Sequence, residues 1–282
     1  MVGCGGSSGT TGLQPEDFQI AVAQVGESTM DLKFRTMDGQ SSSDIGTIPR
    51  SDYASISPNL SKLTYENSTA LEPIKVSDLD GANPHTVGAA NEFGRNPVLS
   101  PDGSKVAFET SITVNSIAEF YIAIANSDGS NQIMIAGPET PHYPQFTPDG
   151  TRVIYYSTAP QSSIQVVNVD GTGQQGFYLA PGDMAYPTLS RDGTRLAFVS
   201  GSNLWVVTLE GGSMKRIADD VAPSKRIYFS PQGSWVVYTA MQENGEGPVT
   251  RPAYVKVNGS GLTYLPTSGM EMVIGIAPGI LP

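Results

Sequence analysis

The ten residues "LSPDGSKVAF", from Leu99 to Phe108, decide the fold of this 282-residue chain. An apolar residue precedes Ser-Pro-Asp-Gly and an alternating apolar run follows, which is the pattern of two strands joined by a tight turn. Nearly the same residues return as "FTPDGTRVIY" from Phe146, "LSRDGTRLAF" from Leu189 and "FSPQGSWVVY" from Phe229. A single turn needs such a sequence once, so its recurrence indicates a repeated architecture.

The repeat has a regular spacing along the whole chain. Two weaker copies, "ISPNLSKLTY" from Ile56 and "LQPEDFQIAV" from Leu13, align with the others without gaps. The fifth position of the motif falls at residues 17, 60, 103, 150, 193 and 233, so successive copies lie 40 to 47 residues apart. A fixed period of this length is typical of repeat folds such as β-propellers.

Each repeat contains a second turn. An alternating apolar run ends in Asp-Gly or a similar pair six times, with the glycines at positions 39, 81, 129, 171, 211 and 259. Asp-Gly after such a run predicts a hairpin, because glycine adopts a positive φ without steric cost. Two turns of this kind give four antiparallel strands in each repeat, which is the size of one propeller blade.

The copies predict one closed propeller. Little strand-like sequence precedes Leu13, and "MVIGIAPGI" from Met272 resembles the first strand that the N-terminal repeat lacks. A C-terminal strand that joins the N-terminal blade would remove the free sheet edges. We therefore predict an all-β fold, a six-bladed β-propeller of four-stranded antiparallel blades over residues 13–282, with residues 1–12 as a flexible tether.

Composition excludes several classes of function. The net charge is −11 and the sequence has no long basic run, so we expect no binding to nucleic acid. It has no run of about 18 apolar residues, so we expect no transmembrane helix. Its two histidines, His85 and His142, fall in different repeats and its one cysteine is Cys4, so we predict no disulfide, metal site or cofactor.

The repeat resembles that of a known family. Ser-Pro-Asp-Gly, a basic residue, an apolar strand and a later Asp-Gly hairpin are similar to the WD40-like repeat of the TolB β-propeller. The same repeat occurs in the propeller domains of prolyl-oligopeptidase-type enzymes. The additional α/β domain of TolB and the hydrolase domain of the oligopeptidases do not fit beside a propeller in these 282 residues. The resemblance therefore implies a cell-envelope setting and an interaction role, without TolB's particular partners.

The N-terminus resembles that of a processed bacterial lipoprotein. Val2-Gly3 stands before Cys4, and a flexible run of Gly, Ser and Thr follows. The resemblance implies lipidation at Cys4 and an exported protein, periplasmic or at the cell surface. We expect this anchor to be its only membrane contact and the protein to be a monomer. The alternative is a chance cysteine in a disordered terminus.

Candidate binding residues come from the start of the first strand of each blade. First strands line the central channel of a propeller, so the equivalent positions form a ring at one channel mouth. Tyrosines and cations make this ring aromatic and locally basic, and Tyr and Arg are typical anchors of binding surfaces. The predicted binding residues are Tyr53, Arg95, Asn96, His142, Tyr143, Tyr186, Lys225 and Arg226. The alternative is that these side chains only fill and close the channel.

These observations favour a non-catalytic propeller that binds a protein or peptide partner in the cell envelope through this channel mouth. One alternative is a propeller-fold enzyme, a lyase or hydrolase, that acts on a glycan or peptide there. Such an enzyme needs paired acidic or histidine groups, and the ring contains only Asp52 and His142. A third possibility is a propeller that serves only as a scaffold.

Overall fold

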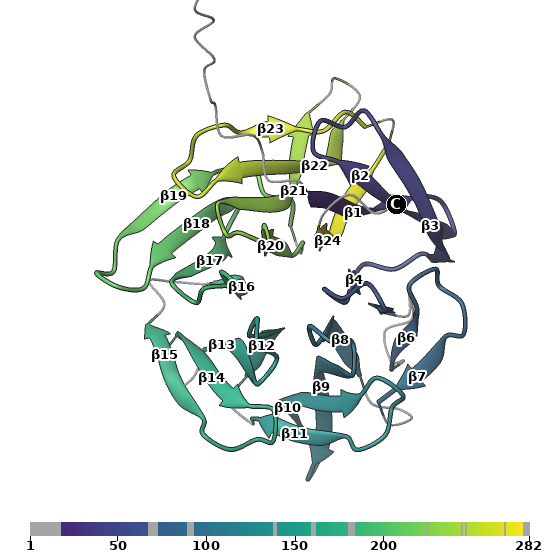
Figure 1. The fold of residues 1–282 in the computed structure, drawn as a ribbon. Helices are drawn as coiled ribbons and strands as arrows, with labels where there is room; N and C mark the ends of the chain where they lie inside the picture. Colours follow the sequence, from purple (N-terminus) through teal and green to yellow (C-terminus); the bar gives the residue numbers. More distant parts are fainter. Residues whose placement is uncertain are drawn as a thin grey trace, which may run out of the picture.

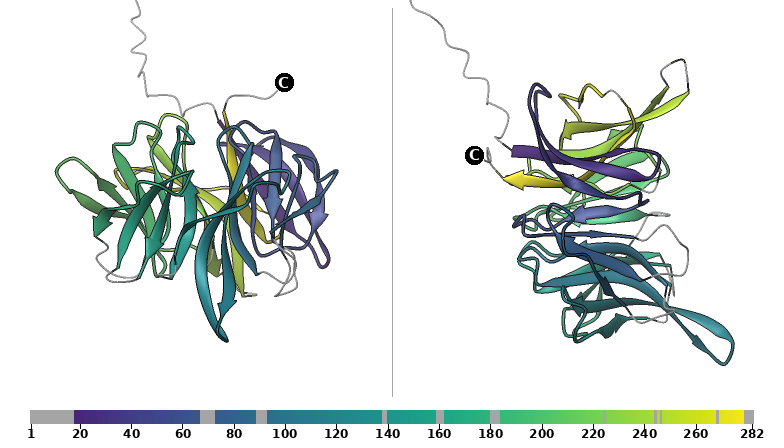
Figure 2. Two further views of the ribbon diagram at one scale, coloured as in Figure 1. Left: turned by 90° about the horizontal axis from the view of Figure 1, so that it is seen from below. Right: turned by 90° about the vertical axis from the view of Figure 1, so that its right-hand side faces the viewer.

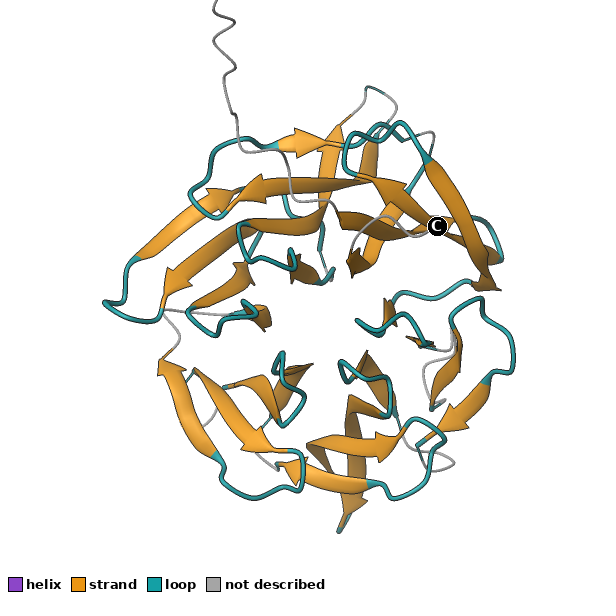
Figure 3. Cartoon of the chain, viewed as in Figure 1, coloured by secondary structure: helices purple, strands orange, loops and turns teal. Residues whose placement is uncertain are grey.

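The computed structural model is a ring of six β-sheets around a central axis (Figures 1 and 3). Each sheet has four antiparallel strands, and the described residues contain no helix. The predicted six-bladed propeller is therefore confirmed. The structure describes residues 18–66, 73–88, 93–137, 140–158, 162–179, 184–223, 225–243, 245, 247–267 and 269–278.

The first three blades are given from the innermost strand outward. Blade 1 contains β24 (Glu271–Pro278), β1 (Phe18–Val25), β2 (Thr29–Thr36) and β3 (Ser42–Pro49). Blade 2 contains β4 (Ala54–Ile56), β5 (Lys62–Tyr65), β6 (Ile74–Asp78) and β7 (His85–Val87). Blade 3 contains β8 (Gly94–Leu99), β9 (Lys105–Val114), β10 (Ile117–Asn126) and β11 (Ile133–Ala136).

The remaining three blades follow the same order. Blade 4 contains β12 (Pro141–Phe146), β13 (Arg152–Ser157), β14 (Ser163–Asn168) and β15 (Gln175–Leu179). Blade 5 contains β16 (Ala185–Leu189), β17 (Arg195–Ser200), β18 (Asn203–Thr208) and β19 (Met214–Ala218). Blade 6 contains β20 (Ile227–Phe229), β21 (Trp235–Glu243), β22 (Pro248–Lys256) and β23 (Thr263–Tyr264).

The C-terminal strand closes the ring as predicted. Strand β24 pairs antiparallel with β1 from Phe18 opposite Pro278 to Gln24 opposite Glu271, with one register shift between Ala21 and Val22. Figure 2 shows these two strands side by side in both views. The predicted tether (residues 1–12), Cys4 and the start of the first repeat copy lie outside the described residues.

The repeated turn forms because its residues bond to one another. The N–H of Gly103 donates to the carbonyl oxygen of Ser100 at 2.9 Å, and Gly103 has a φ of 70° that glycine adopts without strain. The Asp102 carboxylate accepts the Ser100 hydroxyl at 2.6 Å and the Ser104 N–H at 3.0 Å. These bonds lower the pKa of Asp102, with the Ser100 hydroxyl as the main cause, so the carboxylate is a structural part of the turn.

Adjacent blades pack face to face. The buried apolar side chains form six clusters, and each cluster joins residues of two neighbouring blades. Between blades 4 and 5, for example, Ile154 and Tyr156 pack with Leu196 and Phe198. Both faces of a blade are therefore buried, and no blade has a complete core of its own.

The first strands run between the two ends of the central channel. We call one end the tyrosine end, because Tyr53, Tyr143 and Tyr186 lie where β4, β12 and β16 begin. We call the other the proline end, because the first-to-second-strand turns there carry Pro58, Pro101, Pro148 and Pro231. Strand β24 ends and β1 begins at the proline end.

Candidate functional site

The three predicted tyrosines meet at the tyrosine end. The ring centroids of Tyr143 and Tyr186 lie 4.5 Å apart, and the hydroxyl groups of Tyr186 and Tyr53 share a hydrogen bond. Burial raises the pKa of the Tyr186 hydroxyl, so this group stays neutral. The cluster joins blades 2, 4 and 5 across the channel.

A β-bulge places the same position of three first strands at this end. Asn96, Tyr143 and Tyr186 have φ angles of 50°, 56° and 53°, and the pairing of their strands shifts register there. Asparagine tolerates this left-handed backbone, whereas a tyrosine in it is strained. Contacts across the channel must offset that strain.

Arg226 spans the channel beneath the tyrosines. Its side chain is buried, and its guanidinium donates to four acceptors. These are the carbonyl oxygens of Asn96 (2.5 Å), Pro97 (3.3 Å) and Pro144 (3.2 Å) and Oε1 of Gln145 (3.2 Å). The acceptors belong to blades 3 and 4, whereas Arg226 stands just before β20 of blade 6. For Arg226, this arrangement favours a role in closing the channel over a role in binding a partner.

Two glutamates that the sequence reasoning missed hold the first strands of the next blades. The Glu109 Oε1 atom accepts the Tyr143 N–H at 2.7 Å and the Asn96 side-chain amide at 2.6 Å. The Glu66 Oε1 atom accepts the Asn96 N–H at 2.6 Å, and burial raises the pKa of Glu66 to about 7. Glu66 and Glu109 each stand six residues after the fifth position of their motif copy. A glutamate that recurs at this position is the sequence feature that could have identified them.

Lys225 lies at the rim of the tyrosine end. Its Nζ atom donates to the carbonyl oxygen of Asp52 at 3.0 Å and lies 5.8 Å from the centroid of the Tyr53 ring. Burial lowers the pKa of Lys225, and the charges of Asp52 and Glu66 oppose that shift. The side chain therefore joins blade 6 to blade 2.

The last two predicted residues face outward in part. The Nδ1 atom of His142 lies 3.3 Å from Oε2 of Glu109, and this hydrogen bond raises the pKa of His142. Arg95 is exposed and its guanidinium stacks 4.6 Å from the Phe93 ring centroid. The eight residues therefore remain a predicted binding site, with Asn96, Tyr186 and Arg226 buried inside it.

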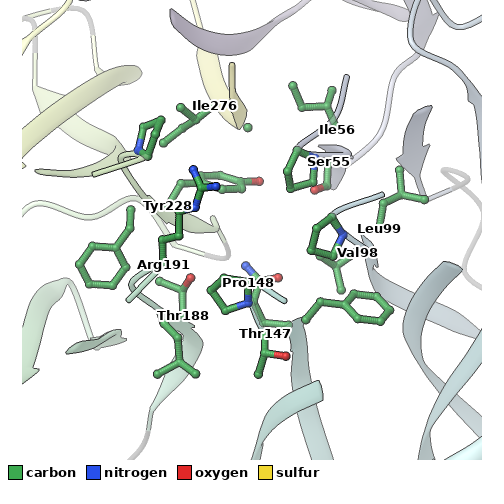
Figure 4. A pocket seen from close by; sticks show the side chains of 18 of the residues that line it. Ser55, Ile56, Val98, Leu99, Thr147, Pro148, Thr188, Arg191, Tyr228 and Ile276 are labelled. Atoms are coloured by element: carbon green, nitrogen blue, oxygen red, sulfur yellow. The ribbon is translucent and has the colours of Figure 1, made fainter. Parts of the chain in front are cut away.

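A cavity of about 450 Å³ lies at the proline end of the channel (Figure 4). Each of the six first strands contributes two adjacent residues to its wall. The second residue of each pair is apolar in every blade: Ile56, Leu99, Phe146, Leu189, Phe229 and Ile276. The rim consists of turn residues, including Pro58, Pro101, Pro148, Arg191 and Pro231.

The sequence carried a signal for this cavity. Five of its six apolar wall residues open a copy of the repeated motif, as Leu99 does in "LSPDGSKVAF", and the sixth, Ile276, belongs to the closing strand β24. An apolar residue before a turn ordinarily indicates core, so the repeat alone does not predict that these residues also line a cavity. Arg191 replaces the proline of the motif in blade 5, which is a visible departure from the repeat.

The cavity is apolar with one cation. Among the twenty described residues that line it, Arg191 alone is charged, and none is Asp, Glu, His or Cys. Across the described part of the chain, no group of three or more His, Cys, Asp or Glu residues is placed to hold a metal ion. Nor do these residues include a helix long and apolar enough to span a bilayer.

The apolar wall of the cavity and its single cation, Arg191, suit it to recognise an apolar group beside a polar or anionic one.

Comparison with known sequences gives distant similarity to a curated protein. No protein-family model matches the chain. The uncharacterized peptidase YuxL of Bacillus subtilis (strain 168) is 25% identical over 191 residues, which are 68% of this chain. The match covers only 28% of that relative, so the chain spans less than a third of its length.

Solved structures identify the fold. The TolB structure from Acinetobacter baumannii matches 93% of this chain and 67% of its own, with 20% identity and a TM-score of 0.72. An oligogalacturonate lyase from Vibrio parahaemolyticus matches 88% of this chain and 75% of its own, with 15% identity and a TM-score of 0.53. At these identities the similarity concerns the fold. The chain therefore has the fold of the TolB β-propeller.

Proposed function

We propose that this chain is a non-catalytic propeller that binds a segment of a protein or peptide partner in the cell envelope. The observation that carries the proposal is the apolar cavity at the proline end, which all six blades build. Its volume of about 450 Å³ falls in the range of pockets that hold a ligand or a few side chains of a partner. The TolB-like fold supports an interaction role by analogy alone.

The two ends of the channel differ in what they offer a partner. At the tyrosine end Arg226, Tyr186 and Glu109 already bond to other protein groups. At the proline end the half-buried side chains of Leu189, Phe229 and Ile276 face open space. Apolar surface that lacks a partner stabilises an association when it is covered, so the proline end is the better docking site.

Two matched blocking variants test which end binds. Pro148→Trp places a large side chain on the exposed rim of the cavity, and Asp52→Trp does so on the exposed rim of the tyrosine end. Partner capture from an envelope extract of the source organism is measured by quantitative pull-down, with thermal unfolding as a check of folding. We expect Pro148→Trp to reduce capture roughly tenfold or more and Asp52→Trp to leave it unchanged.

The opposite result would assign binding to the tyrosine end, as the sequence predicted. Equal capture by both variants and the unaltered chain would reject both ends of the channel.

The alternative function is an enzyme that acts on a glycan or peptide. The reason to consider this alternative is that the chain is similar in fold to an oligogalacturonate lyase. The cavity wall supplies no carboxylate or imidazole for acid–base work. A screen of polysaccharides and peptides, with and without divalent metals, tests this alternative directly, and turnover that Pro148→Trp abolishes would replace the binding proposal.

Export belongs to the same proposal. We infer an exported, periplasmic or cell-surface monomer that is anchored through a lipid on Cys4. The support is the position of Cys4 before a Gly/Ser-rich run together with the envelope setting that the TolB resemblance implies. The genomic sequence upstream of Met1 tests it, because an in-frame basic and apolar segment is expected there. Mass spectrometry of the purified protein then tests for the lipid.

A further inference from the structure

We infer that the proline-end cavity recognises a carboxylate that a partner peptide presents beside apolar side chains, and that Arg191 is the residue that binds it. This inference rests on the proposed function and adds the chemistry of the ligand. Arg191 replaces the proline of the repeated motif on the cavity rim. Four other turns carry proline where blade 5 carries Arg191.

The Arg191 side chain is exposed and available. Within the described part of the chain it forms no hydrogen bond or ion pair. Figure 4 shows it directed from the turn toward the middle of the cavity opening. A Cβ atom built on Gly193 of the same turn would meet no atom within 4 Å, so this turn has free space beside it.

Nearby acidic groups do not neutralise Arg191 inside the cavity. The carboxylate of the adjacent Asp192 accepts the Ser190 hydroxyl at 2.6 Å and the Thr194 N–H at 3.0 Å, and it lies 4.0 Å from Arg195. The equivalent aspartates of two other turns are bonded in the same way, and none of the three lines the cavity. The charge that a ligand meets on the cavity wall is therefore positive.

The remaining wall defines the rest of the ligand. Apolar side chains such as Phe229 and Ile276 would pack against apolar groups. Gln145 also lines the wall, and because its Oε1 atom already accepts from Arg226, its amide N–H groups are the part suited to a peptide carbonyl oxygen. A guanidinium beside such a wall favours a carboxylate, which it binds with charge-assisted hydrogen bonds. The carboxylate comes either from a C-terminus or from an acidic side chain.

Three chemical forms of one set of peptides distinguish a C-terminal carboxylate from the carboxylate of an acidic side chain. The probes are fluorescently labelled pentapeptides with every combination of Leu, Ile, Val and Phe at the last two positions. Each is made as the free acid, as the C-terminal amide, and as an amide extended by one Glu. Binding to the full chain is measured by fluorescence anisotropy.

Two arginines of the same turn give a matched pair of variants. Arg191→Pro introduces the residue that four other blades carry, and Arg191→Gln removes the charge without changing the backbone. Arg195→Gln removes a charge that lies outside the cavity wall. We expect the unaltered chain and Arg195→Gln to prefer a carboxylate form over the plain amide roughly tenfold. Both Arg191 variants should bind the two forms equally.

The outcomes separate this inference from the proposed function. Equal binding of all three peptide forms by the unaltered chain, or a preference for a carboxylate form that persists in both Arg191 variants, would overturn the role of Arg191 while the cavity still binds peptides. Failure of every peptide to bind would reject the proposed function and this inference with it. Tight binding of the Glu-extended amide would identify an acidic side chain as the source of the carboxylate.

Discussion

The Nη2 atom of Arg226, in blade 6, donates to the carbonyl oxygen of Asn96, in blade 3, at 2.5 Å. Blades 3 and 6 face each other across the six-bladed ring, so this bond crosses the central channel. It ties together strands that are 130 residues apart in the sequence. The tyrosine end is therefore cross-linked through the axis as well as through its neighbouring blades.

Replacing Arg226 should destabilise the ring. Arg226→Met keeps the apolar length of the side chain but leaves the carbonyl oxygens of Asn96 and Pro144 without their donor. Buried unpaired acceptors cost about 1–3 kcal/mol each, and we expect the free energy of unfolding to fall by about 2–4 kcal/mol in urea titrations. Arg216→Met, at an exposed arginine of β19, is the control. Equal losses in the two variants would show that the cross-channel bonds are not what stabilises the ring.

The stability of the protein should fall as pH rises through the range in which Glu66 titrates. Burial raises the pKa of Glu66 to about 7 in the folded state, whereas an unfolded glutamate titrates near its ordinary value of about 4.3. A raised carboxyl pKa contributes stability below the unfolded value, and this contribution is lost as pH rises through the folded value.

Glu66→Gln removes that titration but keeps an oxygen for the Asn96 N–H. Its stability relative to the unaltered chain should therefore rise between pH 4.5 and pH 7 by up to about 3 kcal/mol. Thermal or urea unfolding at both pH values measures the difference. Glu210→Gln, at an exposed glutamate, should show no such trend. A pH-independent difference for Glu66→Gln would contradict the assigned cause.

The closing strand should not tolerate a side chain at Gly275. A Cβ atom there would lie 2.3 Å from Cγ1 of Ile56, across the interface of blades 1 and 2. We expect Gly275→Ala to lower the free energy of unfolding by about 1–3 kcal/mol through overpacking. Ile56→Ala removes the Cγ1 and Cδ1 atoms that this Cβ atom would meet, so Gly275→Ala should cost less in that background than in the unaltered chain. Gly176→Ala is the control, because a Cβ atom there would lie 3.9 Å from Nε2 of Gln165, and an equally large effect there would point to a backbone cause instead.

The tip of the long β9–β10 hairpin should be stabilised by glycine. Asn115 and Ser116 form its two-residue turn with φ angles of 50° and 66°. Serine is strained in this left-handed backbone, so Ser116→Gly should raise the free energy of unfolding by about 0.5–1 kcal/mol. Ser111→Gly, in the extended part of β9, should have the opposite sign. Calorimetry of both variants gives the comparison, and a loss of stability in Ser116→Gly would reject this account.

The repeat predicted the fold because it combines local signals. Ser100, Asp102 and Gly103 form their turn from their own hydrogen bonds, so each copy specifies the same corner wherever it occurs. Six copies then fix six blades, and the apolar run from Met272 predicts the closing strand. The weak copies with Leu60 and Asp17 were still recognisable because the spacing is regular.

The candidate site was predicted only in part. Symmetry correctly placed Tyr53, Tyr143 and Tyr186 at one channel end. It did not show that their strained backbone and mutual contacts fill that end, nor that Glu109 supports it. Those features depend on contacts between residues of different blades, so a local pattern such as the carboxylate at Glu66 and Glu109 marks the residues without showing what they bind.

The sequence by itself determined the blades, their number and the closure of the ring, because turn chemistry and strand patterning act over a few residues. Only the tertiary structure decided which end of the channel is closed and which is hollow. At one end the long side chain of Arg226 reaches acceptors across the axis, and at the other the apolar residues at the ends of the first strands, such as Phe229 and Ile276, line a cavity instead. The size and reach of side chains that meet from opposite blades set that difference, and they meet only after the ring has closed.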